Sequence, residues 1–159
     1  MHIVLADLGN PAFVPEPDPM EVDEVLEQLN QALELQLRSL LQFTQASASM
    51  FGLEVQGVAE KLWLFAQSEL EDTKLLVEKI TALGGDPTTK VGELVWDPDP
   101  AKTLDHLIET EDEVTAALHA VIPHSGQEPR SEALEHLMEH VIMRKQNQID
   151  WLRRARRTP

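Results

Sequence analysis

Residues 62–87 read LWLFAQSELEDTKLLVEKITALGGDP, and this stretch decides the fold. Its apolar side chains recur at spacings of three and four, which is the period of an α-helix with one buried face. The run ends at Gly84-Gly85-Asp86-Pro87, because a glycine pair followed by a proline stops a helix. The stretch therefore belongs to a long amphipathic helix, predicted from about residue 55 to residue 83.

The same period predicts three further long helices, and no alternating strand pattern of useful length is present. These helices span about residues 21–51, residues 99 or 100 to just before Pro123, and residues 131–157. A few residues around Gly52 join the first two helices, whereas residues 84–98 separate the second from the third. A connection of that length can cross the whole bundle and make the two helices parallel. We therefore predict an all-α four-helix bundle with a long crossover between helices two and three.

The beginning of the chain differs from the rest. Residues 1–20 contain four prolines and no helical period. Proline blocks helix continuation and pushes the preceding residue toward extended geometry. We expect an irregular, proline-rich N-terminal arm over residues 1–20, followed by the bundle over residues 21–159.

Composition excludes several classes of partner and site. The net charge is −15, from 28 acidic and 13 basic residues. This argues against nucleic acid and anionic membranes, because contacts with phosphate need Lys or Arg. The chain has no cysteine for disulfides or thiolate metal sites. No apolar run approaches the roughly 20 residues that span a bilayer, and residues 1–7 lack the pattern of a signal peptide. We expect a cytoplasmic protein.

Polar residues interrupt the buried face of every predicted helix. A buried polar group costs stability unless it is paired, so such positions are informative. Interruptions at compatible heights on four helices predict one polar layer inside the bundle. Its six members are Gln36, Glu69, Asp72, Glu111, Lys145 and Gln148.

Over about residues 25–155 the chain resembles the bacterioferritin branch of the ferritin-like superfamily. The most specific match is Ile149-Asp150-Trp151 near the end of the last helix. The supporting matches are Leu29-Asn30, Glu69, the stop at residues 83–87, and Glu111. The resemblance implies a ferritin-like bundle. In that family a Glu from each of two helices and a Glu-x-x-His pair from each of the other two hold two irons.

Carried over position by position, the resemblance implies a degenerate diiron site. The first-helix Glu of the family falls on Gln36, and the second-helix pair falls on Glu69 and Asp72. The third-helix Glu falls on Glu111. The fourth-helix pair falls on Lys145 and Gln148.

Only two of these ligands, Glu69 and Glu111, are unchanged, with Asp72 a possible third. A protonated Lys145 cannot ligate a metal, so we expect it to replace the metals electrostatically by pairing with one of the three carboxylates. The six positions are then a vestigial site with no catalytic residue. The position of the family's haem-binding Met is Leu70, so we expect no haem.

Three functions remain open from the sequence. The protein could be a scaffold or self-associating subunit that has lost its ferroxidase centre. It could be an iron-storage subunit that co-assembles with an active ferritin paralogue, in which case iron is a possible cofactor. It could be a metalloenzyme with an altered carboxylate site, although ferroxidase activity is not expected. The resemblance implies a homo-oligomer, at least a dimer along the outer faces of helices one and two.

Two other features bear on these alternatives. The family's short fifth helix, which helps to close its cage, has no counterpart after Trp151, so a complete cage is not expected. His136 and His140 lie four residues apart on the last predicted helix and could share a divalent ion. Histidine pairs at this spacing are common on helix surfaces, and a simple solvated face is the more frequent explanation.

Overall fold

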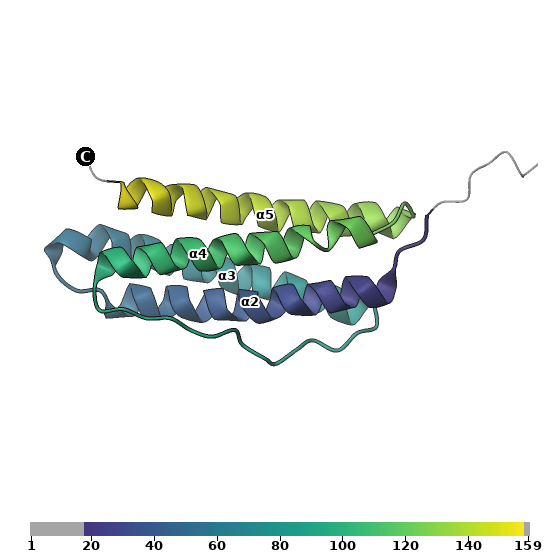
Figure 1. The fold of residues 1–159 in the computed structure, drawn as a ribbon, viewed down its shortest axis with the longest axis horizontal. Coiled ribbons are helices and arrows are strands. Elements are labelled where there is room, and N and C mark those ends of the chain that lie inside the picture. Colours follow the sequence, from purple (N-terminus) through teal and green to yellow (C-terminus); the bar gives the residue numbers. More distant parts are fainter. Residues whose placement is uncertain (1–17, 158–159) are drawn as a thin grey trace, which may run out of the picture.

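The computed structural model describes residues 18–157, which form four long helices (Figure 1). These are α2 (Val22–Ser49), α3 (Gln56–Ala82), α4 (Pro100–His119) and α5 (Pro129–Arg156). Two short 3₁₀ helices, η2 (Leu53–Val55) and η3 (Ile122–His124), lie in the connections. The described residues contain no strand, and the predicted all-α four-helix bundle is confirmed. Within residues 18–157, no helix is both long and apolar enough to cross a membrane.

Two helix ends differ from those predicted. Helix α4 ends at His119, and the residues that the sequence assigned to its last turn lead into η3, which contains Pro123. Helix α5 begins at Pro129, two residues before the predicted start at Ser131. A proline fits the first helical position because the N–H that it lacks has no helical partner there. The Ser131 hydroxyl then accepts a hydrogen bond from the Glu128 backbone N–H at 3.0 Å, which fixes the helix start.

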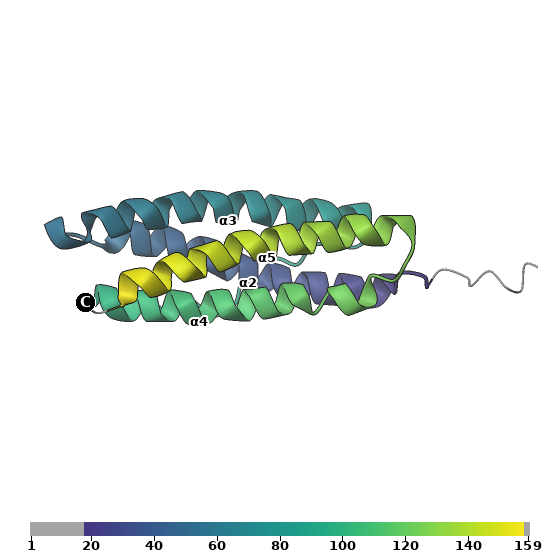
Figure 2. The same cartoon turned by 90° about the horizontal axis from the view of Figure 1, so that it is seen from above.

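The predicted crossover is also confirmed. Helices α2 and α3 run antiparallel, as do α4 and α5, whereas α3 and α4 run in the same direction (Figures 1 and 2). Residues 83–99, which we call the strap, join α3 to α4 and lie along α2. Four hydrogen bonds attach the strap to points along the length of α2: Thr88 N to Asn30 Oδ1 (2.8 Å), Gly92 N to the Glu34 carbonyl (3.2 Å), Val95 N to Gln42 Oε1 (3.1 Å) and Trp96 Nε1 to Ser49 Oγ (3.1 Å).

The last residues of the predicted arm contact the bundle. The Gln127 N–H donates to the Asp18 carbonyl at 2.7 Å, and the Met20 N–H donates to Glu128 Oε2 at 3.2 Å. The Met20 side chain is buried in the core. Residues 1–17 of the predicted arm lie outside the described residues.

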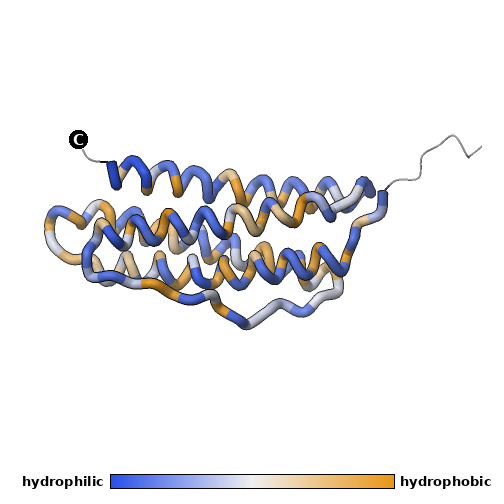
Figure 3. The backbone as a smooth tube through the Cα atoms, in the orientation of Figure 1, coloured by the Kyte–Doolittle hydropathy of each residue, from blue (hydrophilic) through white to orange (hydrophobic). Residues whose placement is uncertain are grey.

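Short apolar stretches recur between polar ones along all four helices, as expected for amphipathic helices (Figure 3). The buried apolar residues form two clusters. One contains Leu29 and Leu33 of α2 with Leu76 and Ile80 of α3, and the other contains Phe43 of α2 with Leu62 of α3. On each helix, buried polar residues lie in the sequence between the two clusters. The bundle therefore has two apolar halves separated by a polar layer.

Candidate functional site

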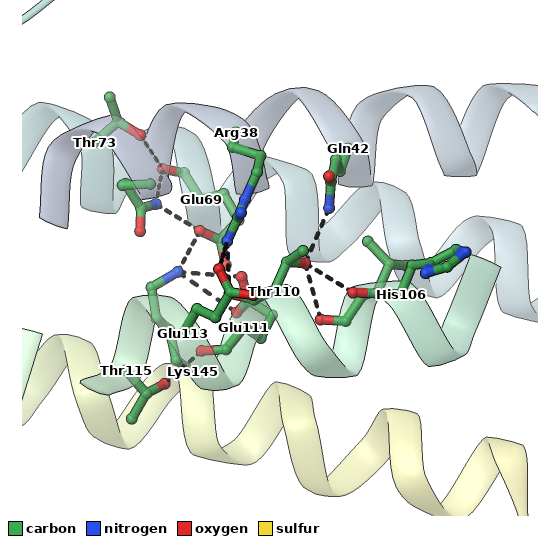
Figure 4. Close-up of polar contacts among 12 residues, drawn as sticks. Arg38, Gln42, Glu69, Thr73, His106, Thr110, Glu111, Glu113, Thr115 and Lys145 are labelled. Carbon is green, nitrogen blue, oxygen red and sulfur yellow. Dashed lines mark hydrogen bonds and ion pairs between the residues drawn. The ribbon is translucent and has the colours of Figure 1, made fainter. Parts of the chain in front are cut away.

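Lys145 of α5 lies at the centre of the polar layer (Figure 4). Its Nζ donates to Glu69 Oε2 of α3 at 2.6 Å and lies 3.5 Å from both carboxyl oxygens of Glu111 on α4. All three side chains are 0% exposed. One ammonium group thus joins three helices through two buried carboxyl groups.

Two amides complete the hydrogen bonding of the carboxyl groups. Gln36 Nε2 of α2 donates to the Glu69 carbonyl at 3.0 Å and also to Glu69 Oε2. Gln148 of α5, with its amide nitrogen oriented toward the carboxyl groups, donates to Glu69 Oε1 at 2.7 Å and to Glu111 Oε2 at 3.3 Å. Five of the six residues predicted from the sequence therefore meet in one layer, with at least one from each helix.

Asp72, the sixth predicted residue, has a different partner. Its Oδ1 accepts a hydrogen bond from Nη2 of Arg144, a residue that was not predicted from the sequence to belong to the layer. The Asp72 side chain is fully buried and that of Arg144 is 29% exposed. The sequence does contain a clue to this pair. Glu69 and Asp72 lie three residues apart on one buried face, so a second cation is expected near Lys145, and Arg144 is the adjacent residue.

Burial and like charge determine the protonation of the layer. Burial and the neighbouring Glu69 raise the pKa of Glu111 to about 8, although Lys145 opposes this shift. Burial alone lowers the pKa of Lys145, but Glu111 and Glu69 more than reverse this effect, so its pKa is raised overall. Near neutral pH, the Lys145 ammonium therefore faces Glu69, its closest carboxyl partner, and a largely protonated Glu111.

The pKa of Asp72 is shifted in the same direction as the pKa of Glu111. Burial and the charge of Glu69 raise its pKa to about 6, while Arg144 and Lys145 oppose the change. A buried carboxyl group prefers its neutral form unless a cation compensates its charge. The ion pair with Arg144 provides that compensation above the pKa.

A second polar group extends the layer between α2 and α4 (Figure 4). Arg38 Nη2 lies 2.9 Å from Glu113 Oε2, and Gln42 Nε2 donates to Thr110 Oγ1 at 2.9 Å. These contacts were not predicted from the sequence. Arg38 and Gln42 are buried, and the strap runs along this part of α2, where Gly92 leaves room for the Arg38 side chain: a Cβ at Gly92 would be 3.2 Å from Arg38 Cδ.

The donor set of the layer consists of two carboxyl groups, two amides and one ammonium. Within the described residues, no three His, Cys, Asp or Glu side chains converge as a metal site would require. His136 is exposed, with Nδ1 3.9 Å from Glu139 Oε2, and His140 is also exposed on α5. This histidine pair is separate from the layer. Leu70 is 58% exposed on α3 and also lies outside it.

Comparison with solved structures places the fold among ferritin-like proteins. A ferritin-like, diiron-carboxylate protein from Bacillus anthracis str. Ames is 22% identical, with a TM-score of 0.77 over 86% of this chain and 97% of that chain. The Rhodobacter capsulatus bacterioferritin is 19% identical, with a TM-score of 0.77 over 84% of each chain. A dodecameric thioferritin, the bacterioferritin-related protein from Bacteroides fragilis, is 14% identical, with a TM-score of 0.75 over 84% of each chain. At these identities the likeness demonstrates a shared fold.

The sequence itself identifies the family. No curated protein matches the chain. The profile of the ferritin-like domain, however, matches residues 26–158. This match covers the four helices apart from the first turn of α2, and it confirms the resemblance to the ferritin-like superfamily. The chain therefore belongs to the ferritin-like family.

Proposed function

We propose that this protein is a ferritin-like subunit that has lost its ferroxidase centre and functions as a self-associating scaffold. The observation that carries the proposal is the position of Lys145, whose Nζ is 2.6 Å from Glu69 Oε2 and 3.5 Å from Glu111 Oε1. A protonated amine has no lone pair for a metal. The residues that correspond to the family's metal ligands are thus linked by an ammonium group.

Charge balance supports this assignment. Two divalent irons bring four positive charges, which a buried site must offset with carboxylates. Here Glu69 and Glu111 are the carboxyl partners of Lys145, and Asp72 is paired with Arg144. Adding divalent cations beside a buried ammonium would introduce strong repulsion at low dielectric. The residues present therefore do not fit a diiron centre, and we propose that Lys145 substitutes for its charge.

Self-association is the second part of the proposal. Trp63 and Leu70 lie seven residues apart on α3 and therefore share one helix face. They are 49% and 58% exposed, and Leu41 of α2 is 42% exposed. Two large apolar side chains exposed on one helix face support a protein interface there. Leu70 also offers no atom that could ligate haem iron, so we propose a dimer without haem along α2 and α3.

An iron-storage subunit that co-assembles with an active ferritin paralogue is the second candidate. Membership of the ferritin-like family and the net charge of −15, which attracts cations, favour it. In that case the chain would contribute acidic surface to a mixed assembly while its partner oxidises iron. Iron retention by the mixed assembly, but not by this chain alone, would identify this function.

Aerobic titration with Fe(II) tests the main proposal. Oxidation is followed by absorbance, retained iron is counted after gel filtration, and the assembly is sized by light scattering. We expect oxidation at the buffer rate, no stoichiometric iron, and a discrete homo-oligomer. Rapid oxidation of about two irons per chain, the stoichiometry of an intact diiron bundle, would contradict the loss of the ferroxidase centre. A strictly monomeric protein would contradict self-association.

A further inference from the structure

A groove separates α3 from α5 on the surface of the bundle. These two helices come close together at fewer positions than α2 and α3 or α4 and α5 do. The space between them is a groove of about 650 Å³. The side chains that line it and matter for its chemistry are Lys61, Phe65, Arg144, Gln148, Trp151 and Arg154.

The groove gathers cations in a strongly acidic protein. Lys61, Arg144 and Arg154 line it, although the chain carries a net charge of −15. Among the described residues, neither Lys61 nor Arg154 forms an ion pair. The one acidic residue at the groove, Asp150, accepts a hydrogen bond from Gln146 at 2.9 Å. Two cations thus lie on one groove without carboxylate partners from residues 18–157.

Arg144 has one donor without a partner. Its Nη2 is paired with Asp72 Oδ1, but its Nε is buried and has no hydrogen-bond partner in the described part of the chain. A buried donor without a partner costs free energy, commonly about 1–3 kcal/mol. This Nε is shielded from solvent, as is the unpartnered Oδ2 of Asp72, so the donor belongs to the buried Asp72–Arg144 ion pair and does not face the groove.

Aromatic rings form the apolar part of the groove. The rings of Phe65 and Trp151 meet edge to face, with centroids 5.6 Å apart and planes at 83°. The Nζ of Lys61 lies 5.3 Å from the centroid of the Phe65 ring. Binding sites for small organic molecules typically combine apolar and aromatic walls with a few polar groups that fix orientation. Guanidinium and ammonium groups beside such walls select an anionic substituent.

We propose that the α3–α5 groove binds a small planar aromatic anion. Arg154 and Lys61 would pair with its anionic group, while Trp151 and Phe65 would contact its ring. This proposal does not depend on the loss of the ferroxidase centre. Gln148 lines the groove and also donates to Glu69 and Glu111, so the ligand would lie beside the buried layer.

Calorimetric titration of the full chain with naphthalenesulfonate tests the proposal, with naphthalenemethanol as the uncharged control and inorganic phosphate as the control without a ring. The salt concentration should be 0.15 M, where the screening length is about 8 Å and distant acidic residues contribute little. We expect saturable binding of one naphthalenesulfonate per chain, and binding of both controls weaker by about tenfold or more. Absence of saturable binding, or equal binding of either control, would overturn the proposal.

Variants locate the site. Arg154→Gln and Lys61→Gln should each weaken naphthalenesulfonate binding by about tenfold, the loss of one charge-assisted hydrogen bond. Arg153→Gln makes the same charge change at the adjacent position, but Arg153 pairs with Asp112 of α4 at 3.1 Å. It should leave binding unchanged. Equal losses in all three variants would show a general charge effect and would rule out the groove.

Discussion

The ammonium of Lys145 and the carboxyl group of Glu69 lie 2.6 Å apart, 76 residues apart in sequence, and both side chains are completely buried. Attraction between such a pair has to offset the cost of removing two charges from water. The pair is therefore most informative when one member is removed, because the other is then left buried without compensation.

Lys145→Ala should strongly destabilise the protein. Glu69 would lose its buried counter-charge, and removing one partner of a buried pair typically costs about 3–5 kcal/mol. Urea denaturation of both proteins measures the difference in free energy of unfolding. Lys74→Ala is the control, because Lys74 is 75% exposed and only pairs with Glu78 along the helix surface. Similar small losses in both variants would show that the Lys145 pair is energetically unimportant.

Stability should fall as pH rises through the titration of Glu111. The pKa of this group is raised from 4.5 to about 8 in the folded state, so its contribution is complete below pH 4.5 and is lost toward pH 8. One proton changes the free energy of unfolding by at most about 1.4 kcal/mol per pH unit. The pKa of Asp72 is raised from 3.8 to about 6, so Asp72 also makes stability fall with rising pH, but only in this lower pH range.

Glu111→Gln isolates the Glu111 contribution. Between pH 6 and pH 8, where the stabilising contribution of Asp72 has already been largely lost, the variant should lack the downward slope that the natural protein shows. Contributions that are common to both proteins cancel in the difference between the two denaturation series. Parallel slopes in the two series would show that Glu111 is ionised in the same way in the folded and unfolded chains.

Arg144→Ala should cost more stability than Arg153→Ala. Arg144 pairs with the fully buried Asp72, whereas Arg153 and Asp112 are 59% and 49% exposed. We expect a loss of about 2 kcal/mol for Arg144→Ala, less than for a wholly buried pair because the guanidinium is partly solvated. A double-mutant cycle with Asp72→Ala separates the pair from other effects. Additive losses would show that the two side chains are not coupled.

Asn30→Ala should loosen one end of the strap while the bundle stays folded. The Asn30 side chain accepts from Thr88 N at 2.8 Å and donates to the Asp86 carbonyl at 3.1 Å. Its loss should speed hydrogen exchange at Thr88 with a global cost of about 1 kcal/mol. Gln31→Ala, at the adjacent exposed position, is the control. Unchanged exchange at Thr88 would show that other contacts hold the strap.

Trp63→Glu combined with Leu70→Glu should convert the proposed dimer into a monomer. Two charges on one apolar face would have to be buried without partners in the interface. Light scattering measures the molecular mass, and circular dichroism checks that the helices are retained. Leu53→Glu, at a 94% exposed position in η2, is the control and should leave the mass unchanged. A dimer that survives the double change would place the interface elsewhere.

The fold and most of the layer could be predicted because helical periodicity determines which residues share a face. Gln36, Glu69, Glu111, Lys145 and Gln148 interrupt regular apolar stripes, so their meeting follows from the bundle. The pairing of Asp72 with Arg144 does not follow, since periodicity does not determine which of two adjacent cations faces a given carboxylate. Arg38 and Gln42 were missed because the strap lies over their part of α2, and the path of a segment without periodicity cannot be predicted from its pattern.

The separation of the apolar core into two halves by a charged layer also determines the alignment of the helices. A slip of α5 by one turn, about 5.4 Å, would move the Lys145 ammonium out of the layer and toward apolar residues. It would also leave Glu69 and Glu111 without their cation. An all-apolar bundle would tolerate such slippage more easily, because one leucine layer resembles the next. The charged layer therefore favours one alignment of α5 over other alignments that would bury similar apolar area. Buried charges of this kind can fix the alignment of helices even where they reduce stability.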